Sequence, residues 1–258
     1  MRVALTIAYD GTPYSGWQSQ PDNNAVQDHI EAAFKTITGT PVRLHASGRT
    51  DAGVHALAQV AHFDPPEMSN LDPNAWQRAL NSNLPPQIRV TATRETPAGF
   101  HARYSATAKT YTYRIVHAPV LPPLEHHRAW HLHSELDTAL LAKALARFQG
   151  THDFAAFAAS RNDGKPRTAD YARRTISNAS LETGNAPLLT LSFTGNGFLY
   201  KMVRLLTGAA THVARGRAPL SWLQDLIDNP AGKRCPHCAP ADGLYLEKVH
   251  YPAASKAS

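Results

Sequence analysis

Residues 47–62 read Ser-Gly-Arg-Thr-Asp-Ala-Gly-Val-His-Ala-Leu-Ala-Gln-Val-Ala-His, a turn followed by a run that predicts a strand. Gly48 and Gly53 permit backbone angles that other residues rarely adopt. Between them lie Arg49 and Asp51, and a carboxylate beside a guanidinium stays ionised because the cation favours its charged form. An ionised aspartate suits a nucleophile or an electrostatic stabiliser. Taken alone, the pair is more typical of a structural salt bridge in a loop, because such pairs also perturb pKa values.

The composition is that of a basic, globular chain. Its 258 residues allow one large domain or two of ordinary size, and 43% hydrophobic residues suffice for a packed core. The 26 Lys+Arg against 20 Asp+Glu suit a polyanionic partner, with nucleic acid ahead of a membrane. We find no apolar run near the roughly 18 to 20 residues that a membrane span needs. Two cysteines cannot form a disulfide framework, and the N-terminus is typical of a first strand rather than a signal peptide. A cytoplasmic protein is therefore expected.

The first part of the chain predicts strands and helices in alternation. Apolar residues recur at a helical period in two segments, and the second of these begins at Asp72-Pro73, an N-cap followed by proline. The predicted helices cover residues 24–38 and 72–83, and the predicted strands cover 2–9, 42–45, 56–63 and 88–93. This order, β-α-β-β-α-β, is that of a split βαβ unit.

The second part predicts a similar layout. The predicted elements are a long strand or pair of strands over 101–117, a hairpin of 175–181 and 188–193, helices over 137–148, 199–214 and 220–227, and a last strand over 243–251. We therefore expect an α+β fold of two ferredoxin-like (split βαβ) halves, residues 1–102 and 103–258, related by a pseudo-twofold duplication. The residues themselves show no visible repeat.

Five basic residues lie between the predicted helix over 137–148 and the predicted hairpin that begins at residue 175. They are Arg161, Lys165, Arg167, Arg173 and Arg174. A charge run of this kind is usually a solvated face. The sharper alternative is a flexible basic loop that faces phosphates.

Several segments together resemble the TruA family of tRNA pseudouridine synthases, in the family's order over nearly the whole chain. The match Gly48-Arg49-Thr50-Asp51-Ala52-Gly53-Val54-His55 is highly specific, and it overturns the structural interpretation of Asp51. The other matches would be weak alone. They are Tyr9-Asp10-Gly11, Gly16-Trp17-Gln18, Phe100-His101-Ala102-Arg103, Lys109-Thr110-Tyr111-Thr112-Tyr113, Gly197-Phe198-Leu199-Tyr200-Lys201-Met202-Val203-Arg204 and Gly243-Leu244-Tyr245-Leu246.

The resemblance implies a cofactor-free isomerisation of uridine to pseudouridine at tRNA positions 38, 39 and 40, in the anticodon stem-loop. The N-glycosidic bond breaks, the uracil turns, and its C5 bonds to the same sugar carbon. Since nothing is gained or lost overall, the chemistry requires no redox partner and no metal. It does require a nucleophile, which Asp51 would supply, and a base flipped out of its stack at a cost of about a few kcal/mol. Family members are homodimers, so we expect a homodimer, with the sheets of the two halves meeting at a central RNA-binding cleft.

The resemblance also assigns roles to residues that would otherwise be ordinary strand, helix or core positions. Arg49 would keep Asp51 ionised and help to fill the place of the flipped base. Tyr111 would stack on the uracil, a contact worth roughly 1–3 kcal/mol, and its hydroxyl could remove the C5 proton. Arg204 would be a second partner of Asp51, and Leu244 would pack under the uracil. Phosphate contacts are expected from five cations: Lys109, Lys201, Arg161, Arg173 and Arg174.

The segment Cys235-Pro-His-Cys238 departs from the family's pattern. Two cysteines and a histidine could begin a zinc site, but a structural site needs four ligands and the chain has no second cysteine pair. A redox motif is expected at a helix N-terminus after a strand, which the flanking prolines do not favour. An inert loop is the preferred interpretation, and no metal is expected.

Two other functions remain open at this point. His133-Ser134-Glu135 with Cys235 and Cys238 resembles the ligands of a zinc nucleobase deaminase, although the separation is very long and Arg234 replaces the expected proline. The chain could also be a non-catalytic RNA-binding protein. The presence of Arg49, Asp51 and Tyr111 argues against that, because a binding protein has no need of a nucleophile.

Overall fold

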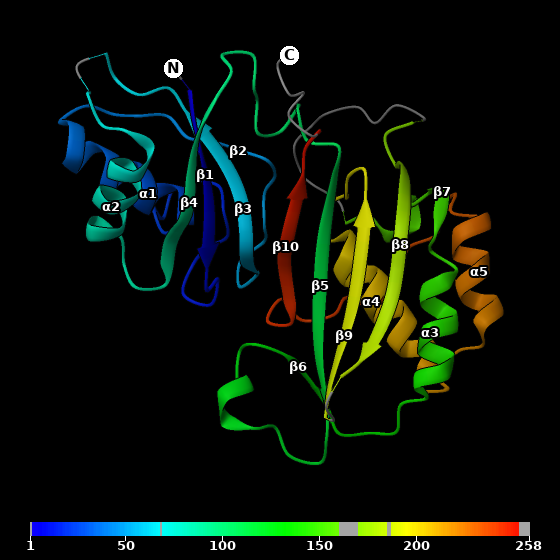
Figure 1. Cartoon of the computed structure of the whole chain (residues 1–258). Coiled ribbons are helices and arrows are strands. Elements are labelled where there is room, and N and C mark those ends of the chain that lie inside the picture. The colour runs from blue at the N-terminus through cyan, green and yellow to red at the C-terminus, as the bar shows by residue number, and fades with distance from the viewer. Residues whose placement is uncertain (1, 68, 160–169, 185–186, 253–258) are drawn as a thin grey trace. The chain divides into compact units, whose positions relative to one another are not determined.

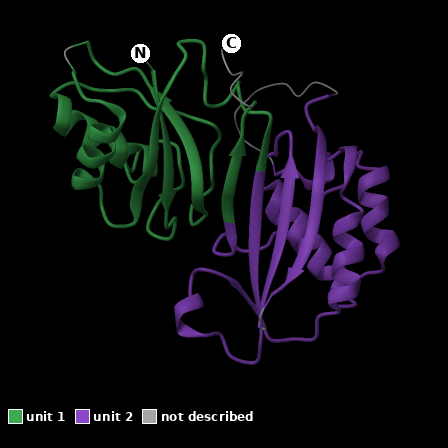
Figure 2. Ribbon diagram, viewed as in Figure 1, with its two compact units in different colours: residues 1–109, 245–258 green, residues 110–244 purple. Residues whose placement is uncertain are grey.

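A computed structural model describes residues 2–67, 69–159, 170–184 and 187–252 of the chain. These residues form ten β-strands and five α-helices in a mixed α+β fold (Figure 1). The chain divides into two compact units, which Figure 2 colours separately. Unit 1 comprises residues 1–109 and 245–258, and unit 2 comprises residues 110–244. The units thus divide the chain seven residues later than the predicted halves, and the last strand, apart from its first residue Leu244, belongs to unit 1.

Unit 1 is built on an antiparallel core of three strands. The central strand β1 (Arg2–Tyr9) pairs with β4 (Ile88–Thr96) on one side and with β3 (His55–Phe63) on the other. Two further strands pair with β3, namely β2 (His45–Ala46), which is antiparallel, and β10 (Leu244–His250), which is parallel. The last strand of the chain therefore reinforces the strand that follows the Asp51 loop.

Two helices cover this sheet, α1 (Val26–Thr38) and α2 (Pro73–Asn83) (Figure 1). Their contact with the strands is an aromatic cluster of Phe34, Phe63 and Trp76, each fully buried. The ring centroids of Phe34 and Phe63 lie 4.4 Å apart, and that of Trp76 lies 5.1 Å from Phe63. Buried aromatic pairs of this kind contribute beyond their area, so they fix the helices on β3.

Unit 2 contains strands in the order β5 (Ala108–His117), β9 (Leu188–Gly195), β8 (Arg173–Thr183) and β7 (Gly150–Asp153). The short β6 (Trp130–Leu132) runs parallel to β5. Helix α4 (Met202–Ala214) passes behind β8 and β9 in the view of Figure 1. Helices α3 (Thr138–Ala146) and α5 (Leu220–Asp228) pack beside it, and two 3-10 turns, η1 (Pro123–Glu125) and η2 (Ala155–Phe157), complete the unit.

Three predicted boundaries were wrong for identifiable reasons. The helix predicted from Leu199 begins at Met202, because Lys201 has a φ of 58°, in the left-handed region that a right-handed helix cannot contain. The strand predicted over 42–45 is reduced to His45–Ala46, since the backbone N–H of Leu44 donates to Glu31 Oε1 (3.1 Å) on α1. The strand predicted from residue 101 begins at Ala108. Residues 101–105 instead form a turn, in which the N–H of Ser105 donates to the carbonyl of His101 (2.9 Å).

None of the helices within the described ranges combines the length and the hydropathy that crossing a membrane requires.

Candidate active site

Asp51 lies in a loop of unit 1 whose backbone is held by buried polar side chains. Ser47 Oγ donates to Gln59 Oε1 (2.6 Å), and Gln59 Nε2 donates in turn to the carbonyl of Gly48 (2.9 Å). Both Ser47 and Gln59 have no exposed surface. A fully paired buried network of this kind rigidifies the backbone around it. Asp51 itself is half-buried, so the frame presents a carboxylate that solvent or a substrate can reach.

Two glycines let the segment after β1 press against the same loop. A Cβ on Gly11 would stand 2.0 Å from the carbonyl oxygen of Val54, so only glycine fits there. Gly16 has a φ of +95°, and a Cβ on it would stand 2.6 Å from the carbonyl oxygen of Thr50. The N–H of Trp17 donates to that oxygen (3.1 Å). The first two motifs of the resemblance, residues 9–11 and 16–18, thus form one structure with the third.

A buried hydroxyl pair fixes the middle of the loop. The hydroxyls of Tyr9 and Thr50 lie 2.8 Å apart, and both residues are buried. Burial raises the pKa of Tyr9, so its hydroxyl keeps its proton at neutral pH. On the other side of Thr50, the N–H of Val54 donates to the carbonyl of Asp51 (3.1 Å) and Gly53 adopts a φ of +77°. The loop is therefore a tight turn with its backbone groups paired inside unit 1.

Lys109 holds the start of the loop. Its Nζ donates to the carbonyl of Ser47 (2.8 Å). Burial, followed by the nearby charge of Arg103, lowers the pKa of Lys109 to about 8. This ammonium group already has a backbone partner in unit 1, and the hydrogen bond attaches Lys109 to the start of the loop. Its expected phosphate contact stays a prediction.

The Phe100–Arg103 motif is attached to β3 through His62. The N–H of Ala102 donates to His62 Nδ1 (3.1 Å), and Arg2 donates to the carbonyl of Phe100 (2.6 Å). His62 is only 2% exposed. Burial, followed by the positive charge of Arg2, lowers the pKa of His62 to about 4. The imidazole is therefore neutral at pH 7, as an Nδ1 acceptor must be.

In unit 2, Tyr111 and Leu244 are both buried near the ends of strands. Tyr111 lies on β5 with 8% of its surface exposed, and Leu244 begins β10 with 6% exposed. The ring of Tyr111 meets Phe198 edge to face, with centroids 5.1 Å apart and an angle of 79° between the planes. Two motifs of the resemblance, residues 109–113 and 197–204, thus come together at this ring pair.

Arg204 is half-buried on the first turns of α4. Its Nε donates to the carbonyl of Ala239 (2.8 Å), and the N–H of Ala239 donates to the carbonyl of Arg204 (3.0 Å). The next residue, Pro240, accepts a hydrogen bond from the hydroxyl of Tyr113 (2.8 Å). The position of the arginine thus depends on the chain segment before β10 as well as on its own helix.

The remaining predicted cations occupy different settings in unit 2. Lys201 lies over the ring of Tyr200, with Nζ 5.3 Å from the centroid. Arg174 donates to the carbonyl of Tyr171 (2.9 Å), whereas Arg173 is exposed at the start of β8. Arg161 lies outside the described residues, as do Lys165 and Arg167.

The two cysteines are free thiols in unlike environments. Cys235 is buried, and burial raises its pKa to about 11, which makes it unreactive at neutral pH. Cys238 is exposed. Across the described ranges, no three His, Cys, Asp or Glu side chains come together in a group that could hold a metal ion. His133, Glu135 and the two cysteines therefore do not assemble the ligands of a zinc deaminase.

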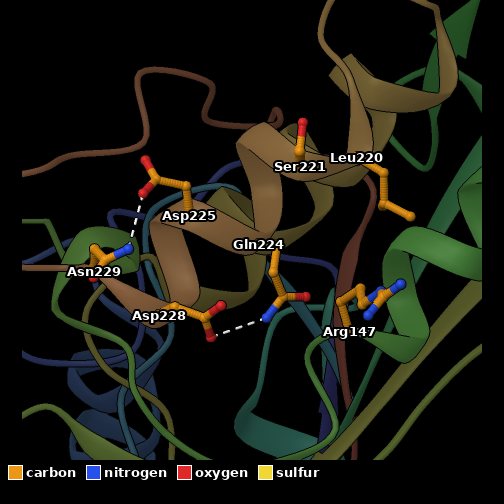
Figure 3. Close-up of a pocket in the computed structure, with 7 residues that line it drawn as sticks. All are labelled: Arg147, Leu220, Ser221, Gln224, Asp225, Asp228 and Asn229. Carbon is orange, nitrogen blue, oxygen red and sulfur yellow. Dashed lines mark hydrogen bonds between the residues drawn. The ribbon is translucent and has the colours of Figure 1, made fainter.

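A pocket of about 430 Å³ between α3 and α5 contains none of the predicted site residues (Figure 3). Its carboxylates are already engaged, since Asp225 accepts from Asn229 (3.0 Å) and Asp228 accepts from Gln224 (2.9 Å). Acidic side chains in this arrangement do not suit a phosphate. Its lining comprises Arg147, Leu220, Ser221, Gln224, Asp225, Asp228 and Asn229.

The predicted residues are therefore shared between the units. Arg49, Asp51 and Lys109 lie in unit 1, whereas the other described candidates lie in unit 2. Ser47 and Gln59, which form the frame beneath Asp51, are functional residues that the sequence motifs do not single out. A signal for Gln59 was present, because a glutamine inside the apolar run of residues 56–63 must find a partner if that strand is buried on both faces.

Comparison with known proteins finds relatives that share one description, tRNA pseudouridine synthase. Residues 5–105 and 144–252 match a family model described as tRNA pseudouridine synthase. A tRNA pseudouridine synthase A of Akkermansia muciniphila is 51% identical over 254 residues, which cover 97% of this chain and 95% of that protein. The Acetivibrio thermocellus protein of the same name is 40% identical over 249 residues, which cover 96% of this chain and 99% of that protein. Among solved structures, the crystal structure of a Cbf5-Nop10-Gar1 complex aligns with a TM-score of 0.34 and 11% identity, over 81% of this chain and 44% of that one.

Proposed function

Because the chain belongs to the tRNA pseudouridine synthase family and isomerises uridine to pseudouridine in tRNA, we propose that Asp51 is the nucleophile of this reaction. The observation that supports this role is its half-buried position on a loop held by Ser47, Gln59 and Thr50. A carboxylate on a rigid frame meets the reacting atom without prior reorganisation, which lowers the entropic part of the barrier.

The substrate would be a uridine flipped out of the anticodon stem-loop of tRNA. The N-glycosidic bond breaks, the uracil turns while it stays bound, and C5 forms a new bond to the same sugar carbon. C5 then loses its proton to a base and N1 carries one, so the product is an isomer of the substrate and no cofactor is consumed. Tyr111 would stack on the loose uracil, and Leu244 would pack beneath it.

The charged residues would divide between the nucleophile and the RNA. Arg49 and Arg204 would keep Asp51 ionised, and Arg49 would help to fill the place of the flipped base. Exposed Arg173 is the strongest candidate for a phosphate contact, because its side chain is accessible at the start of β8. The other proposed phosphate contacts are Lys109, Lys201, Arg161 and Arg174.

We further propose a cytoplasmic homodimer whose chains each contain two ferredoxin-like halves. The support is the family itself together with the repeated use of strands flanked by helices in both units. Sedimentation of the purified protein should give twice the mass of the chain. A stable monomer at micromolar concentration that still modifies tRNA would contradict the dimer without affecting the assignment of Asp51.

The decisive experiment compares wild type, Asp51→Ala and Glu67→Gln on unmodified tRNA. Glu67 is an exposed carboxylate in unit 1 and serves as the matched control. Pseudouridine mapped on the 3′ side of the anticodon stem-loop is expected with wild type and control. Asp51→Ala should form none while its tRNA affinity stays within about twofold. Activity in Asp51→Ala would show that another group is the nucleophile.

A non-catalytic RNA-binding protein is the alternative that this design separates. Such a protein would bind tRNA and leave every uridine unchanged, in wild type as well as in the variants.

A further inference from the structure

The segment Cys235–Pro240, which we call the strap, lies along one stripe of helix α4. Cys235 Sγ contacts the carbonyl oxygen of Leu205 (3.7 Å). One turn further, a Cβ on Gly208 would stand 2.2 Å from the carbonyl oxygen of His237. After another turn, the rings of His212 and His237 stack with centroids 3.7 Å apart and an angle of 19°. Gly208 lies three residues after Leu205 and four after Arg204, and His212 lies four residues after Gly208, so these positions share one side of the helix.

The strap ends on the arginine that begins this stripe. Ala239 and Arg204 exchange two hydrogen bonds, from Arg204 Nε to the strap's carbonyl (2.8 Å) and from the strap's N–H to the helix carbonyl (3.0 Å). Directly after this exchange, the hydroxyl of Tyr113 on β5 donates to the carbonyl of Pro240 (2.8 Å). The strap is thus tied to α4 and to the strand that carries Tyr111 two residues earlier.

The other end of the strap is a packed anchor. The N–H of Cys235 donates to the carbonyl of Ala156 (2.8 Å), and Cys235 is 6% exposed. Its thiol fills space against α4 and also contacts the carbonyl oxygen of His237 (3.6 Å). These contacts account for the small, buried residue at position 235 by packing, without a metal or a disulfide.

We propose that the strap is a positioning element for Arg204. A guanidinium is planar, so a hydrogen bond at Nε sets the direction in which its two terminal nitrogens point. The strap's carbonyl takes that Nε, and the close approach at Gly208 sets how deeply the strap sits against the helix. This inference rests on the proposed function, in which Arg204 supports the ionised Asp51. It assigns Gly208 and the Cys-Pro-His-Cys segment a role in catalysis that acts through Arg204.

The test is Gly208→Ala, whose added methyl must push the strap away, because the atom it meets is backbone. The matched control is Gly184→Ala, the same change at an exposed position of unit 2 with nothing within 4 Å. We expect Gly208→Ala to lower kcat by between about 10- and 100-fold, as small misplacements of catalytic groups do, with KM within about twofold of wild type. The control should match wild type in both constants. Equal kinetics of the two variants would overturn the proposal.

A double-mutant cycle separates positioning from a general loss of structure. If the strap acts through Arg204, Gly208→Ala should cause little further loss in an Arg204→Ala background, because the group it misplaces is already absent. A loss of the same factor in both backgrounds would mean that the glycine acts by another route. Cys235→Ala is the milder second variant, should Gly208→Ala not fold. It removes two thiol contacts, adds no bulk, and should lower kcat in the wild-type background alone.

A readout independent of activity is the Nε–H signal of Arg204 in a 15N-correlated NMR spectrum, assigned by its absence from Arg204→Lys. The signal should exchange slowly in wild type and Gly184→Ala and be lost in Gly208→Ala. Fast exchange in wild type would contradict the strap contact. If wild type formed no pseudouridine, the proposed function would fail while this signal still tested the strap. If Asp51→Ala abolished activity and Gly208→Ala matched its control, the strap inference alone would fail.

Discussion

Gly11 lacks a side chain at the place where the carbonyl oxygen of Val54 approaches the main chain, and that approach holds the Asp51 loop against the end of β1. Beneath the loop, Ser47 and Gln59 satisfy each other in a fully buried position. The loop therefore depends on Gly11, because a side chain there would clash, and on Ser47 and Gln59, because their polar groups pair with each other. Single atoms decide its geometry, because a buried backbone tolerates neither a clash nor an unpaired polar group.

Gly11→Ala should destabilise the protein by about 1–3 kcal/mol and reduce pseudouridine formation, because the new methyl must displace the backbone of Val54. Urea unfolding and tRNA modification assays would measure the two effects. Gly99→Ala is the control, since nothing lies within 4 Å of the methyl that it adds. A Gly11→Ala protein with the stability of this control would show that the loop can move away at no cost.

The buried His62 should make stability fall on acidification. Its pKa is lowered from 6.5 to about 4 in the folded state, chiefly by burial, whereas the unfolded chain takes up its proton near pH 6.5. The contribution of His62 to stability is therefore fully present above pH 6.5 and is lost as the pH falls toward 4, by about 3 kcal/mol in total. Urea unfolding between pH 7 and pH 4 would measure this, with His62→Gln showing a flatter dependence. Equal slopes in both proteins would contradict the assignment.

At the scale of elements, helix ends are set by local chemistry in some places and by tertiary contacts in others. Helix α2 begins where the sequence predicts, because Asp72 Oδ1 accepts from the N–H of Ala75 (2.6 Å) and Pro73 occupies the first helical position. Helix α4 begins later than predicted, at a left-handed Lys201. A cap is encoded within four residues and can be predicted. A left-handed lysine is disfavoured locally and persists only where surrounding structure imposes it.

Asp72→Ala should lower the free energy of unfolding by about 0.5–2 kcal/mol, because the N-cap bond to Ala75 is lost. Asp72→Asn should retain most of that stability, since asparagine caps about as well. Urea titrations of the three proteins would give the values. If the asparagine variant lost as much as the alanine variant, the carboxylate's charge rather than its hydrogen bond would be the stabilising feature.

For the whole molecule, the excess of Lys and Arg over Asp and Glu is the property that matches a tRNA substrate. The charges within the described ranges do not act alike, however. Lys109 and Arg174 donate to backbone carbonyls, whereas Arg173 is exposed. Net charge alone cannot distinguish cations that hold the fold from cations that meet phosphates.

Arg173→Ala should weaken tRNA binding and reduce the slope of log affinity against log salt concentration by about 1, the effect of losing one phosphate contact. Filter binding at several salt concentrations would measure the slope. Arg43→Ala, which removes an exposed arginine of unit 1 outside the candidate set, is the matched control. If Arg173→Ala bound tRNA more weakly than wild type but showed the same salt slope, the arginine would act through packing and not through a phosphate contact.

The amino-acid sequence by itself determined the elements with strong local patterns and the family. Alternation and helical periods located β1, α1, β3 and α2, because those patterns reflect which face of each element is buried. The Gly48–His55 motif led to the tRNA pseudouridine synthases, and the match to the family model confirms that resemblance. The roles of single residues in the reaction stay predictions.

What the tertiary structure alone decided are contacts between residues distant in the chain. It placed β10 parallel to β3, with Tyr245 opposite His55, and tied Lys109 to Ser47. It also brought the strap onto Arg204, a contact that the sequence did not indicate. No local propensity encodes such pairings, because they depend on which surfaces meet once the hydrophobic faces are buried. The motif around Asp51 indicates the family, whereas the packing beneath it determines the conformation of the loop.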